Sequence, residues 1–366
     1  MTFSKYEPYN DLPALPPNGR PWEDLDVYKK LSAARAALAE LKGRAPVIPN
    51  PKMLINTLVL KEAKDSSSIE NIFTTNDKLY KAFATPTTTT DPQTKEVLRY
   101  RHALWSAWQK LDQDGWSLEL IEEIYRTILE AEDGVRDRRV YIGSRSTVIY
   151  SPPCCHDVLT EMLENWLQFI QDETDDIDPL VKMALLHYQF EAIHPFSDGN
   201  GRTGRVLNVL YLSHTGLLDQ PILYLSRFIN DNKPDYYRLL REVTEDGNWK
   251  EWLIYILSAV EETAHYTLDQ VNAIFDLFQR TQEKVKERAP KLYSYELVEM
   301  LFHQPYCKIS FLVDAGIASR NTASKYLNQL EEIGILEKEQ SGNEILFLNK
   351  KLYQLLTENQ DLRTEK

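Results

Sequence analysis

The sequence predicts a mainly α-helical protein, in which a helical bundle with one β-hairpin is followed by a small winged helix-turn-helix domain. Apolar residues recur at helical spacing along most of the chain, as at Ile121, Ile124 and Ile128. Alternation typical of strands occurs once in the first two-thirds, within residues 140–150. After Ala289-Pro290 the pattern changes to short helices and short strands.

Composition restricts the class of protein. The chain has 366 residues, 43% of them hydrophobic and 27% charged, as in ordinary globular proteins. The net charge of −13 argues against broad binding to nucleic acid or to an anionic membrane, because such binding needs clustered Lys and Arg. The N-terminal residues do not resemble a signal peptide, no apolar run is long enough to span a membrane, and three cysteines make no disulfide framework. We therefore expect a cytoplasmic protein without membrane contact.

The chain length favours two or three folding units. We expect an N-terminal helical region over 1–100, a helical core with connecting helices over 101–289, and the winged helix over 290–366. Helices are predicted at Tyr28–Leu41, around Met53–Phe83, and over Trp249–Arg288 in one or more pieces. A helix over Pro179–Ile193 must stop near His194, because the residue before a proline is disfavoured in helical conformation.

The hairpin is predicted from two alternating runs. Val140 and Ile142 form the first, Val148 and Tyr150 the second, and residues 143–146 offer the turn. The prolines that follow block further pairing.

The last part of the chain predicts three helices at Tyr295–Phe302, Ile309–Ala315 and Ser319–Ile333. Strands at Ile335–Leu336 and Glu344–Leu348, turning at residues 341–343, would form the wing. The third helix carries polar residues that could reach a DNA groove, namely Arg320, Asn321, Thr322, Ser324, Lys325 and Asn328. Residues 291–366 nevertheless have more acidic than basic side chains, so DNA contact is less favoured than a protein-interaction role.

One segment between two predicted helices carries the chemistry. It consists of His194, Pro195, Phe196, Ser197, Asp198, Gly199, Asn200, Gly201, Arg202, Thr203, Gly204 and Arg205. We interpret it as a loop with three glycines and an asparagine that leads into a helix, a place where backbone N–H groups converge on an anion. Two arginines reinforce the anion site, Asp198 suits Mg²⁺ beside a phosphate, and His194 can accept a proton near neutral pH.

Other interpretations of these residues remain. A glycine-rich segment can be a surface turn, and Gly199–Val206 half-matches a P-loop but has Arg205 where Lys is required. His187 and His194 lie seven residues apart, which is not a usual metal-ligand spacing. Cys154-Cys155-His156 lacks a spacer between its cysteines and is interpreted as a structural turn.

The segment resembles the signature of the Fic family, His-Pro-Phe-x-(Asp/Glu)-Gly-Asn-Gly-Arg-x-x-Arg, and matches every fixed position. The resemblance extends from about Pro51 to Ile256. It implies a Fic-type helical bundle with ATP as the usual donor. It further implies AMP transfer from ATP to a Ser, Thr or Tyr hydroxyl of a protein.

The resemblance also implies roles for single residues. His194 would be the general base, and Asp198 would hold Mg²⁺ between the α- and β-phosphates. Arg202 and Arg205 would bind the β- and γ-phosphates, while Phe196 would anchor the loop in the core. The anion hole would be formed by Gly199, Asn200 and Gly201. The full set expected to contact ATP is Asp198, Gly199, Asn200, Gly201, Arg202, Thr203, Gly204, Arg205 and Tyr236.

In such proteins the hairpin is a flap that aligns the target chain. Its first strand would run over Arg139–Gly143, and the flap residues would be Val140, Tyr141, Ile142 and Gly143. An ordinary packed hairpin is the alternative.

Residues Ser66 to Asn71 (Ser-Ser-Ser-Ile-Glu-Asn) resemble the Fic inhibitory motif, (Ser/Thr)-x-x-x-Glu-(Gly/Asn). By this resemblance Glu70 would pair with Arg205 and so occupy the arginine meant for the γ-phosphate. A carboxylate among phosphates also adds like-charge repulsion. In some relatives the same glutamate helps to remove AMP.

Two other functions stay open at this point. The chain could be a DNA-binding transcription regulator whose Fic part senses nucleotide, or a Fic protein that uses another donor, such as a CDP-linked one. An intact His194 weighs against pure sensing, and intact Arg202 and Arg205 favour a triphosphate. Self-modification and a homodimer are further expectations.

Overall fold

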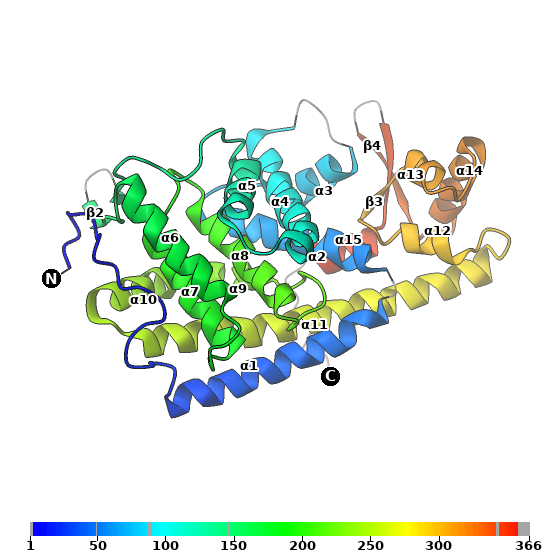
Figure 1. Ribbon diagram of the computed structural model, residues 1–366. Coiled ribbons are helices and arrows are strands. Elements are labelled where there is room, and N and C mark those ends of the chain that lie inside the picture. Colours follow the sequence, from blue (N-terminus) through cyan, green and yellow to red (C-terminus); the bar gives the residue numbers. More distant parts are fainter. Residues whose placement is uncertain (1–2, 49, 86–89, 145–146, 342–343, 358–366) are drawn as a thin grey trace.

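The structure is a computed structural model that describes residues 3–48, 50–85, 90–144, 147–341 and 344–357. Its first three-quarters form a helical bundle with one two-stranded hairpin (Figure 1). The elements are α1 Leu25–Arg44, the 3₁₀ turn Ala45–Val47, α2 Pro51–Ile69, α3 Asn76–Ala84, α4 Pro92–Asp114, α5 Leu118–Leu129, β1 Ile142–Ser144, β2 Thr147–Tyr150, α6 His156–Gln171, α7 Pro179–Ile193, α8 Asn200–His214, α9 Leu225–Asp231, α10 Lys233–Asp246 and α11 Trp249–Arg288.

Helix α7 lies at the centre of the bundle. Asp178 begins it by accepting a hydrogen bond from the Leu180 N–H at 2.9 Å, and Pro179 fits the first helical turn because its missing N–H is not needed there. Most of its side chains are buried on all sides, so it shows no polar face. It packs against α6, α8 and α11.

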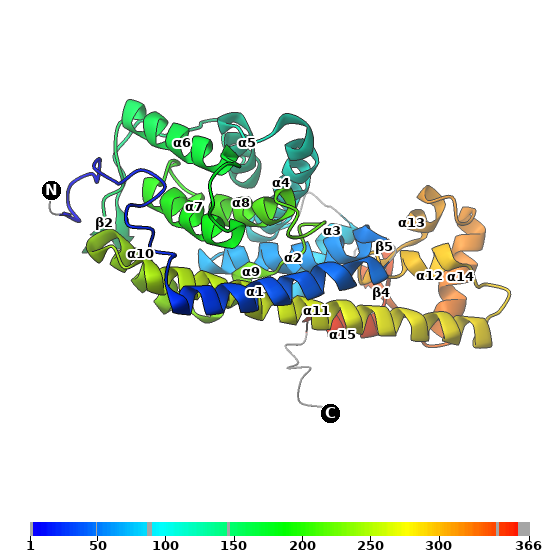
Figure 2. The same ribbon diagram turned by 60° about the horizontal axis from the view of Figure 1, so that its bottom comes forward.

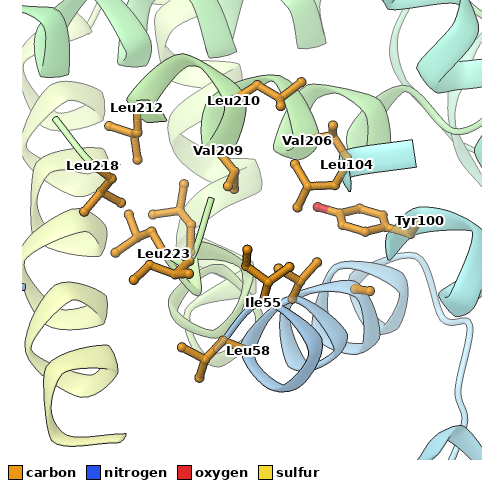
Figure 3. Packing of buried hydrophobic residues seen from close by; sticks show 14 of the residues in the cluster. Ile55, Leu58, Tyr100, Leu104, Val206, Val209, Leu210, Leu212, Leu218 and Leu223 are labelled. Atoms are coloured by element: carbon orange, nitrogen blue, oxygen red, sulfur yellow. The ribbon is translucent and has the colours of Figure 1, made fainter. Parts of the chain in front are cut away.

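An apolar core between α2, α4 and α8 supports the helix that begins within the signature segment, residues 194–205. Figure 3 shows Ile55 and Leu58 of α2, Leu104 of α4 and Val206 of α8 directed into one apolar cluster. All four side chains are at most 2% exposed. The helix that ends at the inhibitory motif and the helix that begins at the signature segment therefore share one core.

Helix α11 is one continuous helix of 40 residues. It packs along α1, and both views show the two helices side by side (Figures 1 and 2). Trp252 fixes α11 to α7 by donating its indole N–H to the Ala184 carbonyl at 2.9 Å. The far end of α11 carries the C-terminal part of the chain.

The C-terminal part contains α12 Tyr295–Met300, β3 Tyr306–Cys307, α13 Ile309–Asp314, α14 Arg320–Glu332, β4 Glu337–Ser341, β5 Glu344–Leu348 and α15 Lys350–Thr357. Its strands form an antiparallel sheet in the order β3-β5-β4. Strand β3 and helix α15 were not expected. The winged-helix description stays a prediction.

The first wing strand was predicted too early. Ile335 and Leu336 are not in a strand, because their N–H groups bond back to the Leu330 carbonyl at 2.9 and 3.3 Å and close the end of α14. Gly334 has a φ of 67°, which lets the chain turn there. Strand β4 begins only at Glu337. The predicted turn falls largely on residues 342–343, outside the described residues.

The hairpin is present but begins later than predicted. Strand β1 starts at Ile142, so Val140 and Tyr141 precede it. Gly143 and Ser144 belong to β1 rather than to the turn, and residues 145–146 lie outside the described part of the chain. A register shift between Ile142 and Gly143 marks an irregularity in the pairing with β2.

The shared core predicts a stability effect. Leu104→Ala should lower the free energy of unfolding by about 3 kcal/mol, because Leu104 is fully buried and its removal leaves a cavity. Leu25→Ala is the control, since Leu25 is 68% exposed and should change stability by less than about 0.5 kcal/mol. Urea unfolding followed by circular dichroism measures both. Equal effects would contradict the described packing.

Candidate functional site

His194 ends α7 in a left-handed backbone conformation, with φ 51° and ψ 59°. This conformation costs a non-glycine residue free energy, so surrounding contacts must hold it. The His194 N–H still bonds to the Phe190 carbonyl at 3.0 Å, and Pro195 then prevents the helix from continuing. The imidazole is therefore placed at a sharp turn between α7 and α8.

Arg136 supports this turn through hydrogen bonds to its backbone carbonyls. Its side chain is 3% exposed and donates to the carbonyls of His194 at 2.9 Å and Pro153 at 2.7 Å. Its own N–H donates to the Pro195 carbonyl at 2.9 Å. Sequence reasoning missed Arg136, since nothing in the Asp-Gly-Val-Arg-Asp-Arg-Arg run distinguishes it from the neighbouring arginines.

Phe196 and Asn200 lock the segment after the histidine. Phe196 is fully buried, as predicted, and stacks on Tyr125 with ring centroids 4.1 Å apart. The Asn200 side-chain oxygen accepts the Phe196 N–H, and its amide donates to the Phe196 carbonyl, both at 2.8 Å. Both polar groups of the Asn200 side chain are thus bonded to the backbone of Phe196.

The prediction of three glycines and an asparagine in a loop is wrong. Helix α8 begins at Asn200, so Gly201 and Gly204 lie in its first turns and Gly199, with φ 70°, precedes it. The helix starts earlier than predicted because two hydrogen bonds between the Asn200 side chain and the Phe196 backbone fix its first residue. The first N–H groups of α8 have no carbonyl partner within the helix, so the predicted anion site is compatible with this earlier helix start.

Two glycines of α8 are needed for close approach. A Cβ on Gly201 would lie 2.4 Å from Glu70 Oε1, and a Cβ on Gly204 would lie 2.7 Å from Glu191 Oε1. Any larger residue at either position would displace a carboxylate.

Arg205 is the buried cation of the site, with 1% exposure. Its Nη2 lies 3.0 Å from Glu70 Oε1, its Nε donates to the Ser66 hydroxyl at 2.8 Å, and Nη2 also donates to the Ser66 carbonyl at 2.9 Å. Ser66 lies in the last turns of α2 and Glu70 directly follows that helix. Both inhibitory-motif residues therefore bind the same guanidinium.

The pairing with Arg205 lowers the pKa of Glu70. Burial alone would raise it, but the positive charge of Arg205 and its hydrogen bond to Glu70 bring the pKa below the usual value. Glu70 is therefore ionised at neutral pH. Its side chain remains 31% exposed, on the side of the cavity described next.

A cavity of about 530 Å³ lies between the hairpin, α7, the start of α8 and α10. This is a usual size for a small-molecule site. Predicted residues that line it are Glu70, Ile142, Gly143, His194, Asp198, Gly199, Asn200, Gly201, Arg205 and Tyr236. Predicted residues that do not line it are Ser66, Val140, Tyr141, Arg202, Thr203 and Gly204.

Arg202 does not line the cavity. It is 2% exposed and forms ion pairs with Glu96 of α4 and, at 3.2 Å, with Asp198. Burial lowers the pKa of its guanidinium to about 10, so it remains charged at neutral pH. In this arrangement Arg202 orients Asp198.

Burial and the nearby charge of Arg136 lower the pKa of His194 to about 4. The backbone of Glu191 and the charge of Glu70 act in the opposite direction without cancelling this effect. The imidazole is therefore neutral at physiological pH and able to accept a proton.

Tyr236 lines the cavity but is 2% exposed, and its hydroxyl lies 2.9 Å from Nε2 of His187. Its neighbour Tyr237 is 45% exposed. The hydroxyl of Tyr236 is thus engaged within the protein, and its placement beside an adenine stays a prediction.

Asp198 is the one carboxylate of the signature segment. Its side chain is 76% exposed, and its Oδ1 accepts the Gly199 N–H at 2.6 Å. Among the described residues there is no group of three or more His, Cys, Asp or Glu that could hold a metal ion. A single exposed carboxylate beside an anion site does fit Mg²⁺ that takes its other ligands from phosphates and water.

Three family profiles match consecutive parts of the chain. They are Fic/DOC family N-terminal over residues 28–109, Fic/DOC family over 115–212, and Protein adenylyltransferase SoFic-like, C-terminal domain, over 277–352. The chain belongs to the Fic/DOC family. The mainly helical fold and the membership expected from the signature segment are thereby confirmed.

Curated relatives of this Fic chain are protein adenylyltransferases. Protein adenylyltransferase fic-1 of Caenorhabditis elegans is 34% identical over 149 residues, which are 40% of this chain and 27% of that protein. Protein adenylyltransferase Fic of Drosophila mojavensis is 29% identical over 154 residues, 40% of this chain and 28% of that protein. The match thus covers little more than a quarter of these relatives.

Solved structures of Fic proteins share the fold. A Fic family protein from Desulfovibrio desulfuricans superposes with a TM-score of 0.56 at 20% identity and covers 87% of this chain and 95% of its own. A Fic domain containing signaling protein from Bacteroides thetaiotaomicron gives a TM-score of 0.53 at 18% identity, over 64% of this chain and 95% of its own. At these identities the likeness concerns the fold alone.

The Arg136 contacts predict a coupled effect on stability and on His194. Arg136→Met should lower the free energy of unfolding by about 3 kcal/mol, because several buried carbonyls lose their donor. It should also raise the pKa of His194, since a nearby positive charge is removed. Urea unfolding and an NMR titration of the His194 ring measure the two effects.

Arg138→Met is the matched control, because Arg138 lies in the same segment with an exposed side chain. It should leave both quantities unchanged. A His194 pKa that does not move in Arg136→Met would contradict the electrostatic role of Arg136.

Proposed function

We propose that this Fic protein transfers AMP from ATP to a Ser, Thr or Tyr hydroxyl of a protein. The observation that carries the proposal is the meeting, in one cavity, of a neutral His194, the free N–H groups at the start of α8, and the buried cation Arg205. These supply a base, an anion site and a phosphate partner. The curated relatives named protein adenylyltransferase support it.

In the proposed reaction the target hydroxyl oxygen forms a bond to the α-phosphorus of ATP. The bond between that phosphorus and the oxygen bridging to the β-phosphate breaks, pyrophosphate leaves, and the hydroxyl proton passes to the His194 imidazole. The backbone N–H groups of Gly199, Asn200 and Gly201 stabilise the charge that develops on the phosphoryl oxygens. The β-hairpin at the cavity aligns the target chain.

Mg²⁺ completes the proposed site. Asp198 would hold it, and the bound ion would neutralise charge on the phosphates. The Arg202 guanidinium and the Gly199 N–H both donate to Oδ1 of Asp198. These contacts use one carboxylate oxygen, so lone pairs of the carboxylate remain for a metal ion.

In this proposal Glu70 inhibits AMP transfer. It holds the Arg205 guanidinium that would otherwise bind the terminal phosphate. Its own negative charge lies at the same place and repels the nucleotide. In this proposal, the arrangement in which Glu70 pairs with Arg205 is the inhibited one.

A neutral, cavity-lining His194 favours transfer over the alternative of a nucleotide-sensing regulator, which would need no base. Use of another donor, self-modification, a homodimer, AMP removal and DNA contact by the C-terminal part stay predictions from the sequence. No helix within the described residues is long and apolar enough to cross a membrane.

Labelling with α-³²P-ATP and Mg²⁺ tests AMP transfer and its inhibition by Glu70. Glu70→Gly should increase label on protein at least about tenfold over the unmodified chain, a change of about 1.4 kcal/mol, because it frees Arg205 for the nucleotide. His194→Ala in the Glu70→Gly background should abolish the label. Cell lysate serves as the source of target protein.

Two outcomes would count against the proposal. Equal labelling with and without Glu70→Gly would contradict the inhibitory role of Glu70. Labelling that survives His194→Ala would contradict the role of His194 as the base. No label in any reaction would favour another donor or a sensing role.

The depressed pKa of His194 predicts the pH profile of transfer. A base must be unprotonated, so activity should persist down to about pH 4–5, where an ordinary histidine of pKa about 6.5 would already be protonated. The measurement is the initial rate of the Glu70→Gly variant between pH 4.5 and 8, with unfolding monitored in parallel. A rate that halves near pH 6.5 would contradict it.

A further inference from the structure

The first residues of the described chain lie against the hairpin. Both views place this end of the chain beside β2 (Figures 1 and 2). The Tyr9 N–H donates to the Ser151 carbonyl at 3.0 Å, the Ser151 hydroxyl donates to the Lys5 carbonyl at 2.8 Å, and the Cys154 N–H donates to the Asn10 side chain at 2.9 Å. The segment over residues 3–10 is therefore attached to the chain directly after β2.

This attachment places Phe3 in the wall of the cavity. Its ring lies nearly parallel to that of Tyr150, with centroids 6.1 Å apart and planes 21° apart. It meets the Tyr9 ring edge-on, with centroids 5.4 Å apart. Two aromatic contacts and the main-chain bonds thus hold Phe3 at a position remote in sequence from every motif.

The lining of the cavity combines two kinds of surface. Asp198, the start of α8 and Arg205 supply the polar and charged part described above. Phe3, Tyr150, Tyr188 and Leu240 supply aromatic and aliphatic lining, and the rings of Phe3 and Tyr150 are in contact. The hydroxyl of Tyr150 donates to the Ala192 carbonyl, and that of Tyr188 bonds to the Thr244 hydroxyl, both at 2.9 Å.

The hydroxyls of Tyr150 and Tyr188 are therefore already bonded within the protein, and their rings offer mainly carbon to a ligand. A nucleoside triphosphate whose phosphates contact the start of α8 and Arg205 carries its flat, weakly polar base at the other end of its own structure. Aromatic side chains bind such bases by stacking and by apolar contact.

We propose that Phe3 is a nucleotide-binding residue that contacts the base of ATP from the aromatic part of the cavity lining. The inference rests on the proposed function, because it takes ATP as the ligand. The segment over residues 3–10 is then part of the nucleotide site rather than only a support for the hairpin. Phe3 determines affinity through the base and has no effect on phosphate recognition.

Direct binding measurements test this without requiring transfer. Isothermal titration of the Glu70→Gly chain, with and without Phe3→Ala, compares ATP with inorganic tripolyphosphate, which has no base. Phe3→Ala should weaken ATP binding about tenfold, the effect of losing one base–aromatic contact, and leave tripolyphosphate binding unchanged. Phe3→Tyr should restore ATP binding.

Tyr6→Ala is the matched control, because Tyr6 lies in the same segment, is 59% exposed and does not line the cavity. It should alter neither dissociation constant. ATP binding that is unchanged in Phe3→Ala would overturn the inference. An equal loss for ATP and tripolyphosphate would also overturn it, since Phe3 would then only hold the hairpin in place.

The proposed function fails in a different way. Binding of ATP without any transfer to protein would count against AMP transfer and leave the Phe3 result valid. Absence of ATP binding by the Glu70→Gly parent chain would overturn both.

Discussion

The buried guanidinium of Arg205 is the interaction on which the site depends. A charge at 1% exposure is costly unless a counter-charge and hydrogen bonds compensate it, and here both come from the end of α2. Glu70 supplies the charge and Ser66 two hydrogen-bond acceptors. The same contacts tie α2 to α8, so the electrostatic requirement of one residue fixes the position of the inhibitory motif. A phosphate could replace Glu70 as counter-charge, while Ser66 would keep its bonds.

His194, like Glu70, depends on a buried arginine. Its left-handed backbone needs support, and Arg136 gives it through the His194 and Pro195 carbonyls. The charge of Arg136 also helps to keep the imidazole neutral. One buried arginine thus supports the geometry of the proposed base and, together with burial, keeps it neutral, so a residue outside the signature segment bears directly on its chemistry.

The sequence was informative where function depends on short-range order. Residues 194–205 lie on one turn and one helix start, so the spacing of His194, Asp198 and Arg205 already implied a common site, and the motif at Ser66 and Glu70 implied its partner. The sequence did not reveal the hydrogen bonds of Asn200 to Phe196, which move the start of α8, or the contacts of Arg136 and Phe3. These depend on segments that meet only after folding. Ile335 was misplaced for a related reason, because a helix cap and a strand start look alike in two apolar residues.

The position of Glu70 limits how the proposed inhibition could be relieved. Helix α2 contributes Leu54, Leu58 and other fully buried side chains to the shared core, so withdrawing the helix would expose a large apolar area at about 25 cal/mol per Å². Glu70 itself follows the helix, its side chain is 31% exposed, and Asn71 already adopts a left-handed conformation with φ 62°. Rotation of one side chain, or of the turn at residues 70–71, breaks the ion pair with Arg205 and leaves the core intact. The contact between Glu70 and Arg205 is therefore separable from the fold, since α2 is fixed and only the residue that follows it has to move.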